Sequence, residues 1–173
     1  MTSSTFINGA RFILLFLLQI FVFKRLSLGW EGYIYINVLI YPLFILLLPL
    51  RTPKPAILGL AFLMGLCIDW FYDSPGIHAS ASVFTAFMRP YVLYWYTPRE
   101  GYNVNYSPTK KRMGLSWFAK YAATLLAMHI FWYFSVEAFT FFYLLDILTK
   151  TVFTLVLSTL VTLMIMLIFN PVD

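Results

Sequence analysis

The chain has 173 residues, of which 61% are hydrophobic and only 11% are charged, and its mean hydropathy is +0.81. A soluble domain is usually about 45–50% apolar and about 25% charged, so this composition excludes an ordinary soluble fold and indicates an integral membrane protein. The formal net charge of +5 does not indicate nucleic-acid binding, because the basic residues fall in short loops between apolar runs, where they set membrane topology. We expect a single integral membrane domain over residues 1–173.

The first half of the chain predicts three membrane spans. The first covers about residues 6–23 and, lacking a small-residue cleavage site, should stay in place as a signal anchor. The second covers about residues 33–50 and should kink at Pro42, because proline removes an internal helix hydrogen bond. A rigid basic connection, residues 51–55, leads into the third span at about residues 56–72.

The second half predicts two or three further spans. The fourth covers about residues 77–96 and is followed by a long polar loop up to residue 112. The fifth covers about residues 114–136, and a less sharply bounded sixth lies within residues 139–169. If the last two apolar regions divide differently, the total is five. The predicted fold class is therefore all-α, a polytopic transmembrane bundle of five to six helices.

Charges in the loops predict the orientation. Six spans put both termini on one side of the membrane, and if that side is the cytoplasm the inner loops are the more basic ones, as the positive-inside rule favours. The inner basic residues would be Arg51, Lys54, Arg99, Lys110, Lys111 and Arg112, against Lys24, Arg25 and Lys150 outside. We therefore expect cytoplasmic termini.

The third and fourth spans form a hairpin that concentrates the candidate functional residues. Ionisable side chains in apolar segments are costly and often functional, and small residues at helical spacing let helices approach closely in lipid. Both features occur on this hairpin, at Ala61, Gly65, Asp69, Gly76, His78, Ala79, Ser82 and Arg89.

Several interpretations of the charged residues in this hairpin stay open. An Asp69–His78 or Asp73–His78 hydrogen bond would staple the turn, or His78 would face a partner helix or a small outer cavity. Arg89 lies about 13 Å deeper than Asp69, too far for a direct salt bridge. We expect Arg89 to snorkel to the cytoplasmic interface or to cap carbonyls near Pro90, with a partner or lipid headgroup as the alternative.

The remaining polar residues support simpler interpretations. Asp146 and Lys150 are four residues apart in the favourable order for an ion pair on a helix, and we expect His129 to be a satisfied core histidine. The basic cluster Lys110, Lys111 and Arg112 should attract anionic lipid.

Catalysis and metal binding have little support in the sequence. Asp69 and Asp73 share a helix face, but a capping role explains Asp73, and only one histidine is nearby. The sequence contains no phosphate-binding loop, no zinc-protease motif and no nucleophile-elbow motif. We therefore expect no enzymatic activity, no metal and no cofactor.

The hairpin carries a family resemblance. Gly65-x-x-x-Asp69, a short turn, Gly76, and then small residues including Ala79 and Ala81 resemble the rod shape-determining family MreD, in its Bacteroidota-type form. The resemblance implies a non-enzymatic inner-membrane component of the bacterial cell-elongation complex, which regulates cell shape and lateral peptidoglycan synthesis. It also implies a fold similar to that of the S-components of energy-coupling-factor transporters.

The resemblance further implies partners. Members of this family bind the bitopic protein MreC and, through it, associate with MreB and the RodA–PBP2 synthase. We expect a transmembrane helix of MreC to pack on the small-residue faces of the hairpin, with Asp69 or His78 as a polar tether, so that the eight residues named above become partner-binding candidates.

Two other functions stay open. One is a vitamin-binding S-component of an energy-coupling-factor transporter, which predicts a solvent-accessible outer cavity near Asp69, His78 and Glu137. The other is a membrane chaperone or assembly factor.

Overall fold

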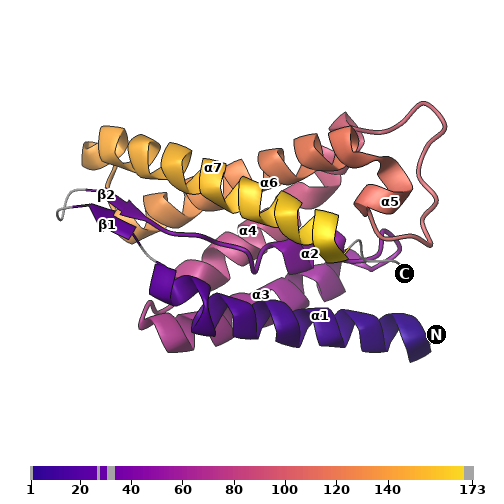
Figure 1. Ribbon diagram of the computed structural model, residues 1–173, viewed down its shortest axis with the longest axis horizontal. Coiled ribbons are helices and arrows are strands. Elements are labelled where there is room, and N and C mark those ends of the chain that lie inside the picture. Colours follow the sequence, from indigo (N-terminus) through magenta and orange to yellow (C-terminus); the bar gives the residue numbers. More distant parts are fainter. Residues whose placement is uncertain (1, 27, 31–33, 170–173) are drawn as a thin grey trace.

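The structure is a computed structural model that describes residues 2–26, 28–30 and 34–169, and it is predominantly helical (Figure 1). The long helices are α1 (Thr2–Phe21), α3 (Lys54–Tyr72), α4 (Ile77–Trp95), α6 (Leu115–Ala138) and α7 (Leu144–Phe169). The shorter elements are the 3₁₀ turns η1 (Phe23–Leu26) and η2 (Phe141–Tyr143), the strands β1 (Leu28–Trp30) and β2 (Ile34–Ile36), and the helices α2 (Leu43–Leu47) and α5 (Lys110–Met113).

Three of the described helical segments are long and apolar enough to cross a membrane: Phe6–Leu26, Lys54–Tyr72 and Leu144–Phe169. They indicate a membrane protein, as the composition predicts, while the number of crossings stays a prediction. Helices α4 and α6 are long enough, at 19 and 24 residues, but are less apolar. Their polar side chains are buried inside the protein: His78, Ser82, Thr85 and Arg89 on α4, and His129 on α6.

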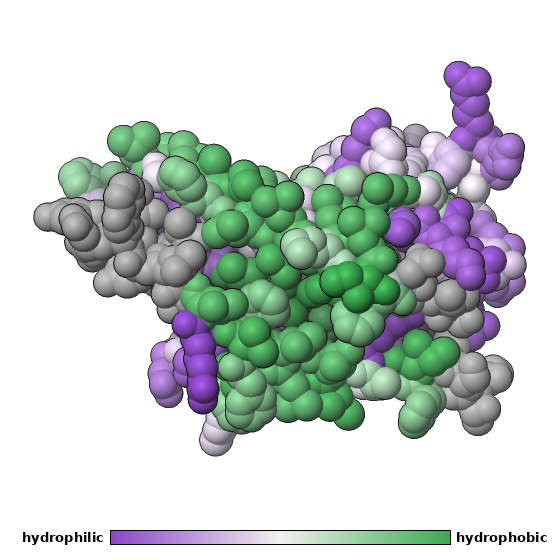
Figure 2. Space-filling view, in the orientation of Figure 1, coloured by the Kyte–Doolittle hydropathy of each residue, from purple (hydrophilic) through white to green (hydrophobic). Residues whose placement is uncertain are grey.

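The long helices form a bundle around a central segment, residues 37–48, which contains α2. Helix α4 packs against both α3 and α6, and α7 packs against α6. In Figure 1, α1 and α3 run along one side and α6 and α7 along the other, and the chain leading to α2 passes between them. Figure 2 shows an apolar surface across the middle of this face, with hydrophilic residues toward its two ends, as a bilayer requires.

The segment predicted as a second helical span, residues 33–50, is not a helix over most of its length. Strand β2 pairs antiparallel with β1, with Leu28 opposite Ile36, and within the described residues 34–50 the only α-helix is α2. Pro42 stands immediately before α2 instead of kinking a longer helix. Irregular backbone at membrane depth is tolerated where protein covers it, and Ile40 and Tyr41 are fully buried.

Side chains from two helices satisfy the backbone of this central segment. The Oε1 of Gln19, on α1, accepts a hydrogen bond from the amide of Ile40 at 2.9 Å, and its Nε2 donates to the carbonyl of Val38 at 3.1 Å. From α7, the Oγ of Ser158 accepts from the amide of Leu39 at 2.9 Å. Buried backbone groups must be paired, so these two side chains allow the segment to cross the bundle without its own helix.

Replacing Gln19 with leucine should therefore destabilise the protein by about 2–4 kcal/mol, because it leaves buried backbone groups unpaired. Unfolding of the purified protein in mixed micelles, followed by circular dichroism, measures this change. Thr149→Val is the matched control, since the Thr149 hydroxyl bonds only to the Leu145 carbonyl in its own helix. Equal stability of the Gln19→Leu variant and the wild type would contradict the assigned role.

Candidate functional site

Asp69 joins the two helices of the hairpin by capping the start of α4. Its Oδ1 accepts hydrogen bonds from the amide of His78 at 2.9 Å and from the hydroxyl of Ser74 at 3.0 Å, and its Oδ2 accepts from the amide of Ala79 at 2.9 Å. A carboxylate is favoured there because the first amides of a helix have no partner in the helix and carry partial positive charge. Of the two hydrogen bonds left open by the sequence, the structure has the one between Asp69 and His78, but the donor is the backbone of His78 and not its ring.

The turn between the helices uses two left-handed residues. Asp73 ends α3 with φ 53°, and Gly76 precedes α4 with φ 84°. Aspartate and glycine tolerate this conformation better than most residues. Asp73 therefore terminates α3 through its backbone amide, which donates to the carbonyl of Asp69, while Gly76 occupies the N-cap position of α4.

The small residues of the hairpin face each other. A Cβ atom added at Gly65 would lie 2.4 Å from the Cα of Ala79, which is far inside van der Waals contact. Ala61 and Ser82 are fully buried as well. The expectation that these faces are open to a foreign helix is therefore corrected: α3 and α4 already fill them with each other.

A hydrogen-bonded chain of four side chains lies behind the hairpin. The hydroxyl of Tyr41 is 2.9 Å from Nδ1 of His78 and 2.7 Å from Nε2 of His129, and Nδ1 of His129 is 2.7 Å from Oγ1 of Thr85. All four residues are fully buried. The chain links the central segment, α4 and α6, and it confirms that His129 is a satisfied core histidine.

The hydrogen-bond donors among these four side chains can be assigned. Thr85 donates its single hydroxyl proton to the carbonyl of Ala81 at 2.8 Å, so Nδ1 of His129 must be the donor to Thr85. Nε2 of a neutral His129 then accepts from Tyr41, and the Tyr41 oxygen accepts from Nδ1 of His78. This leaves Nε2 of His78 as a bare acceptor, which agrees with the absence of a protein partner for that buried atom.

Arg89 is buried near the other end of α4 and does not reach an interface. Its Nε donates to the hydroxyl of Tyr121 at 3.1 Å, and Nη2 donates to the carbonyl of Leu48. Tyr121 in turn donates to the carbonyl of Leu46 at 3.1 Å. Arg89 thus caps the carbonyl end of α2, which corrects both the expected snorkelling and the expected capping near Pro90. As predicted, it does not pair with Asp69.

Charged side chains outside the hairpin make one contact that the sequence predicts and one that it does not. Asp146 and Lys150 form the predicted ion pair at 2.9 Å. The guanidinium of Arg112 lies over the ring of Tyr106, 3.8 Å from its centroid. Within residues 2–26, 28–30 and 34–169, no group of three histidine, cysteine or acidic residues is placed to hold a metal ion.

Of the eight candidate residues, Gly76 is exposed and Ala79 is buried, yet both border one surface groove. This hairpin groove has a volume of about 560 Å³ and lies over α4 between α3 and α6. Its lining is almost entirely apolar and comprises Leu58, Phe62, Gly76, Ala79, Ser80, Val83, Phe84, Phe87 and Trp132.

Sequence reasoning gave no functional weight to Gln19, Tyr41, Thr85 and Tyr121. Gln19 and Thr85 carried a usable signal, because polar residues within apolar segments mostly face the protein interior. Tyr41 and Tyr121 carried none, since tyrosine is also common at membrane interfaces.

Comparison of the chain with protein-family models, with curated proteins and with solved structures finds no match. Its function must therefore be argued from its own geometry and from the resemblance in the hairpin.

Asp69→Asn should destabilise the protein by about 1–3 kcal/mol, because the amide keeps one acceptor oxygen and turns a donor toward a backbone amide. Asp73→Asn makes the same chemical change at an exposed site that still favours the left-handed conformation, and should change stability by less than about 0.5 kcal/mol. Unfolding in mixed micelles measures both variants. Equal effects would show that the cap on α4 is not what stabilises the hairpin.

The donor assignment predicts that both histidines are neutral and carry their proton on Nδ1. Imidazole ¹⁵N NMR of the histidine-labelled protein in micelles distinguishes protonated from bare ring nitrogens. Tyr41→Phe should alter the signals of both rings, whereas Tyr91→Phe, at an exposed position on α4, should alter neither. A protonated Nε2 on either histidine would contradict the assignment.

Proposed function

We propose that this chain is a non-enzymatic scaffold of the bacterial cell-elongation complex, similar to MreD, that lies in the inner membrane and binds MreC through transmembrane helices. The observation that carries the proposal is the hairpin itself. Gly65 permits contact between its helices, Asp69 caps α4, and Gly76 turns the chain between them. Three of the residues that carry the resemblance therefore have a defined physical role, as the residues of a structural signature should.

The partner surface in this proposal is the hairpin groove and not the buried faces of α3 and α4. Small residues in its lining, including Gly76, Ala79 and Ser80, allow another backbone to approach, which is how helices associate in lipid. Phe62, Phe87 and Trp132 border it and offer exposed apolar area to a partner helix. Asp69 and His78 then act by holding α4 in place and not as a direct tether.

The transport alternative requires one outer cavity shared by Asp69, His78 and Glu137. In the structure Asp69 borders a surface hollow at the turn, while Glu137 borders a different one beside Asp146 and Lys150. The ring of His78 is fully buried against Tyr41. The separation of Asp69, His78 and Glu137 favours the scaffold function over that of a vitamin-binding S-component. The resemblance to MreD implies a similar fold for both families, so the fold alone does not distinguish them.

The proposed topology has six crossings, five made by the long helices and one by the central segment, with both termini in the cytoplasm. It accounts for the basic residues on α5, because Lys110, Lys111 and Arg112 then face the cytoplasmic leaflet, where they attract anionic lipid. The MreB and RodA–PBP2 partners would be reached indirectly, through MreC.

Co-purification from native membranes tests the function and the surface separately. The tagged wild-type chain should recover MreC in mild detergent. Ser80→Phe fills the hairpin groove and should lower that recovery at least about tenfold, the factor that corresponds to 1.4 kcal/mol. Gly65→Leu is unsuitable for this test, because its side chain would clash inside the hairpin.

Ser135→Phe is the matched control, because Ser135 is a partly buried α6 serine that bonds only to the carbonyl of Phe131 in its own helix and does not border the groove. Failure of the wild type to recover MreC, or recovery of an ATPase-linked coupling subunit, would refute the scaffold function. Unchanged recovery with Ser80→Phe would leave the function standing and refute the groove as the partner surface.

A further inference from the structure

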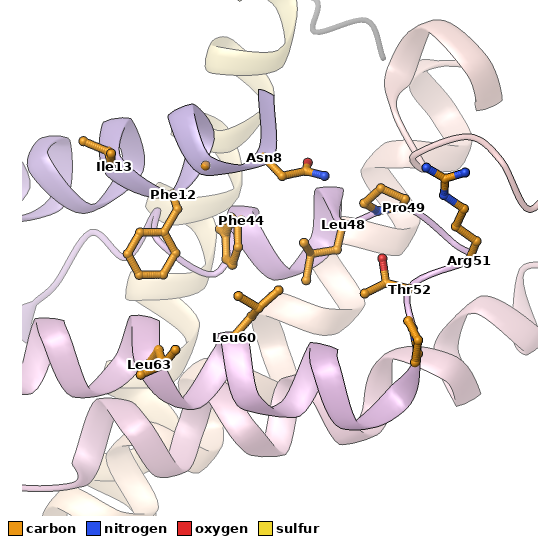
Figure 3. Close-up of a pocket in the computed structure, with 12 residues that line it drawn as sticks. Asn8, Phe12, Ile13, Phe44, Leu48, Pro49, Arg51, Thr52, Leu60 and Leu63 are labelled. Atoms are coloured by element: carbon orange, nitrogen blue, oxygen red, sulfur yellow. The ribbon is translucent and has the colours of Figure 1, made fainter. Parts of the chain in front are cut away.

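A second groove lies between α1 and α3, away from the hairpin groove. It has a volume of about 740 Å³, and α2 lies at its base. Figure 3 shows Phe12 and Ile13 of α1 on one side, Leu60 and Leu63 of α3 on the other, and Phe44 between them. This α1–α3 groove is therefore a strip of apolar surface several side chains long.

One end of the α1–α3 groove is polar and basic. Arg51 and Thr52, in the connection that leads to α3, line that end, and Figure 3 shows them at the opposite end of the groove from Ile13 and Leu63. Asn8 of α1 also lines the groove. Arg51 is exposed, so its guanidinium is accessible to an anion.

The walls of the groove carry no opposing charge. The chain has no aspartate or glutamate in residues 1–30 or 32–68, and these ranges include every residue that lines the groove. The lining of the groove therefore offers an anion the Arg51 guanidinium and no carboxylate to oppose it. An apolar strip that ends in a cation matches a molecule with an apolar chain and an anionic head.

We propose that the α1–α3 groove binds one anionic glycerophospholipid. An acyl chain lies along the apolar strip from Leu48 toward Leu63, and the phosphate lies at Arg51 and Thr52. Burial of the chain in the groove supplies apolar contact, and the phosphate–guanidinium pair supplies charge-assisted hydrogen bonds. This inference is independent of the proposed scaffold function, because it requires only that the protein lies in a bilayer.

Gly9 provides a way to block the groove without disturbing the fold. It lines the groove on α1, and a Cβ atom added there meets nothing within 4 Å. Leucine also favours a helix more than glycine does. Gly59, on α3, has the same open surroundings but does not line the groove, so Gly59→Leu is the matched control.

Native mass spectrometry of the detergent-purified full chain, titrated with phosphatidylglycerol or phosphatidylcholine, tests the proposal. The wild type should retain one phosphatidylglycerol and bind phosphatidylcholine more weakly. Arg51→Ala should weaken phosphatidylglycerol binding about fivefold, the factor for one basic residue. Gly9→Leu should weaken it about tenfold, the factor for the lost burial of roughly two methylene groups.

Two controls separate this site from general attraction to anionic lipid. Gly59→Leu should bind as the wild type does, and so should Lys120→Ala, which removes an exposed charge on α6 that does not line the groove. Equal binding of the two lipids, or wild-type binding by Arg51→Ala or by Gly9→Leu, would overturn the proposal. Loss of a co-purifying protein from Gly9→Leu without loss of lipid would overturn it too, and would assign the groove to a partner helix.

Discussion

The structure depends on a backbone segment, residues 37–48, that crosses the centre of the bundle with only the one short helix α2. Lipid offers no hydrogen bonds, so every amide and carbonyl at that depth must find a partner within the protein. Gln19 and Ser158 supply partners to residues 38–40, and Arg89 and Tyr121 supply them to the carbonyls of Leu48 and Leu46. The burial of Gln19, Arg89, Tyr121 and Ser158 is thus explained by the needs of this one segment.

The same constraint connects the segment to the hairpin. Tyr41 belongs to the central segment, and its hydroxyl lies between His78 of α4 and His129 of α6. Asp69 fixes the start of α4 through the amides of His78 and Ala79, so the cap on α4 also positions the ring that reaches Tyr41. Buried hydrogen bonds with defined donors and acceptors favour one arrangement of the helices over its alternatives. In the proposed scaffold function, a fixed α4 would present the hairpin groove to a partner in one defined shape.

The two grooves would divide the surface between different occupants. The hairpin groove has small residues in its lining and suits the close approach of another helix. The α1–α3 groove has longer apolar side chains along its walls and a cation at one end, which suits an amphiphile. A lipid held between α1 and α3 would also cover apolar area that the weak packing of α1 on the bundle leaves open.

The sequence by itself indicated a membrane protein, placed the five long helices and paired Asp146 with Lys150, but it left open whether Asp69 or Asp73 bonds to His78. These follow from composition, apolar periodicity and contacts within a few residues. Only the tertiary structure decided that residues 37–42 stay irregular, that Arg89 caps Leu48, and that the small faces of α3 and α4 fill each other. The reason is that an apolar run predicts a helix whether lipid or protein surrounds it. Whether the run forms that helix depends on hydrogen-bond partners that lie far away in the sequence.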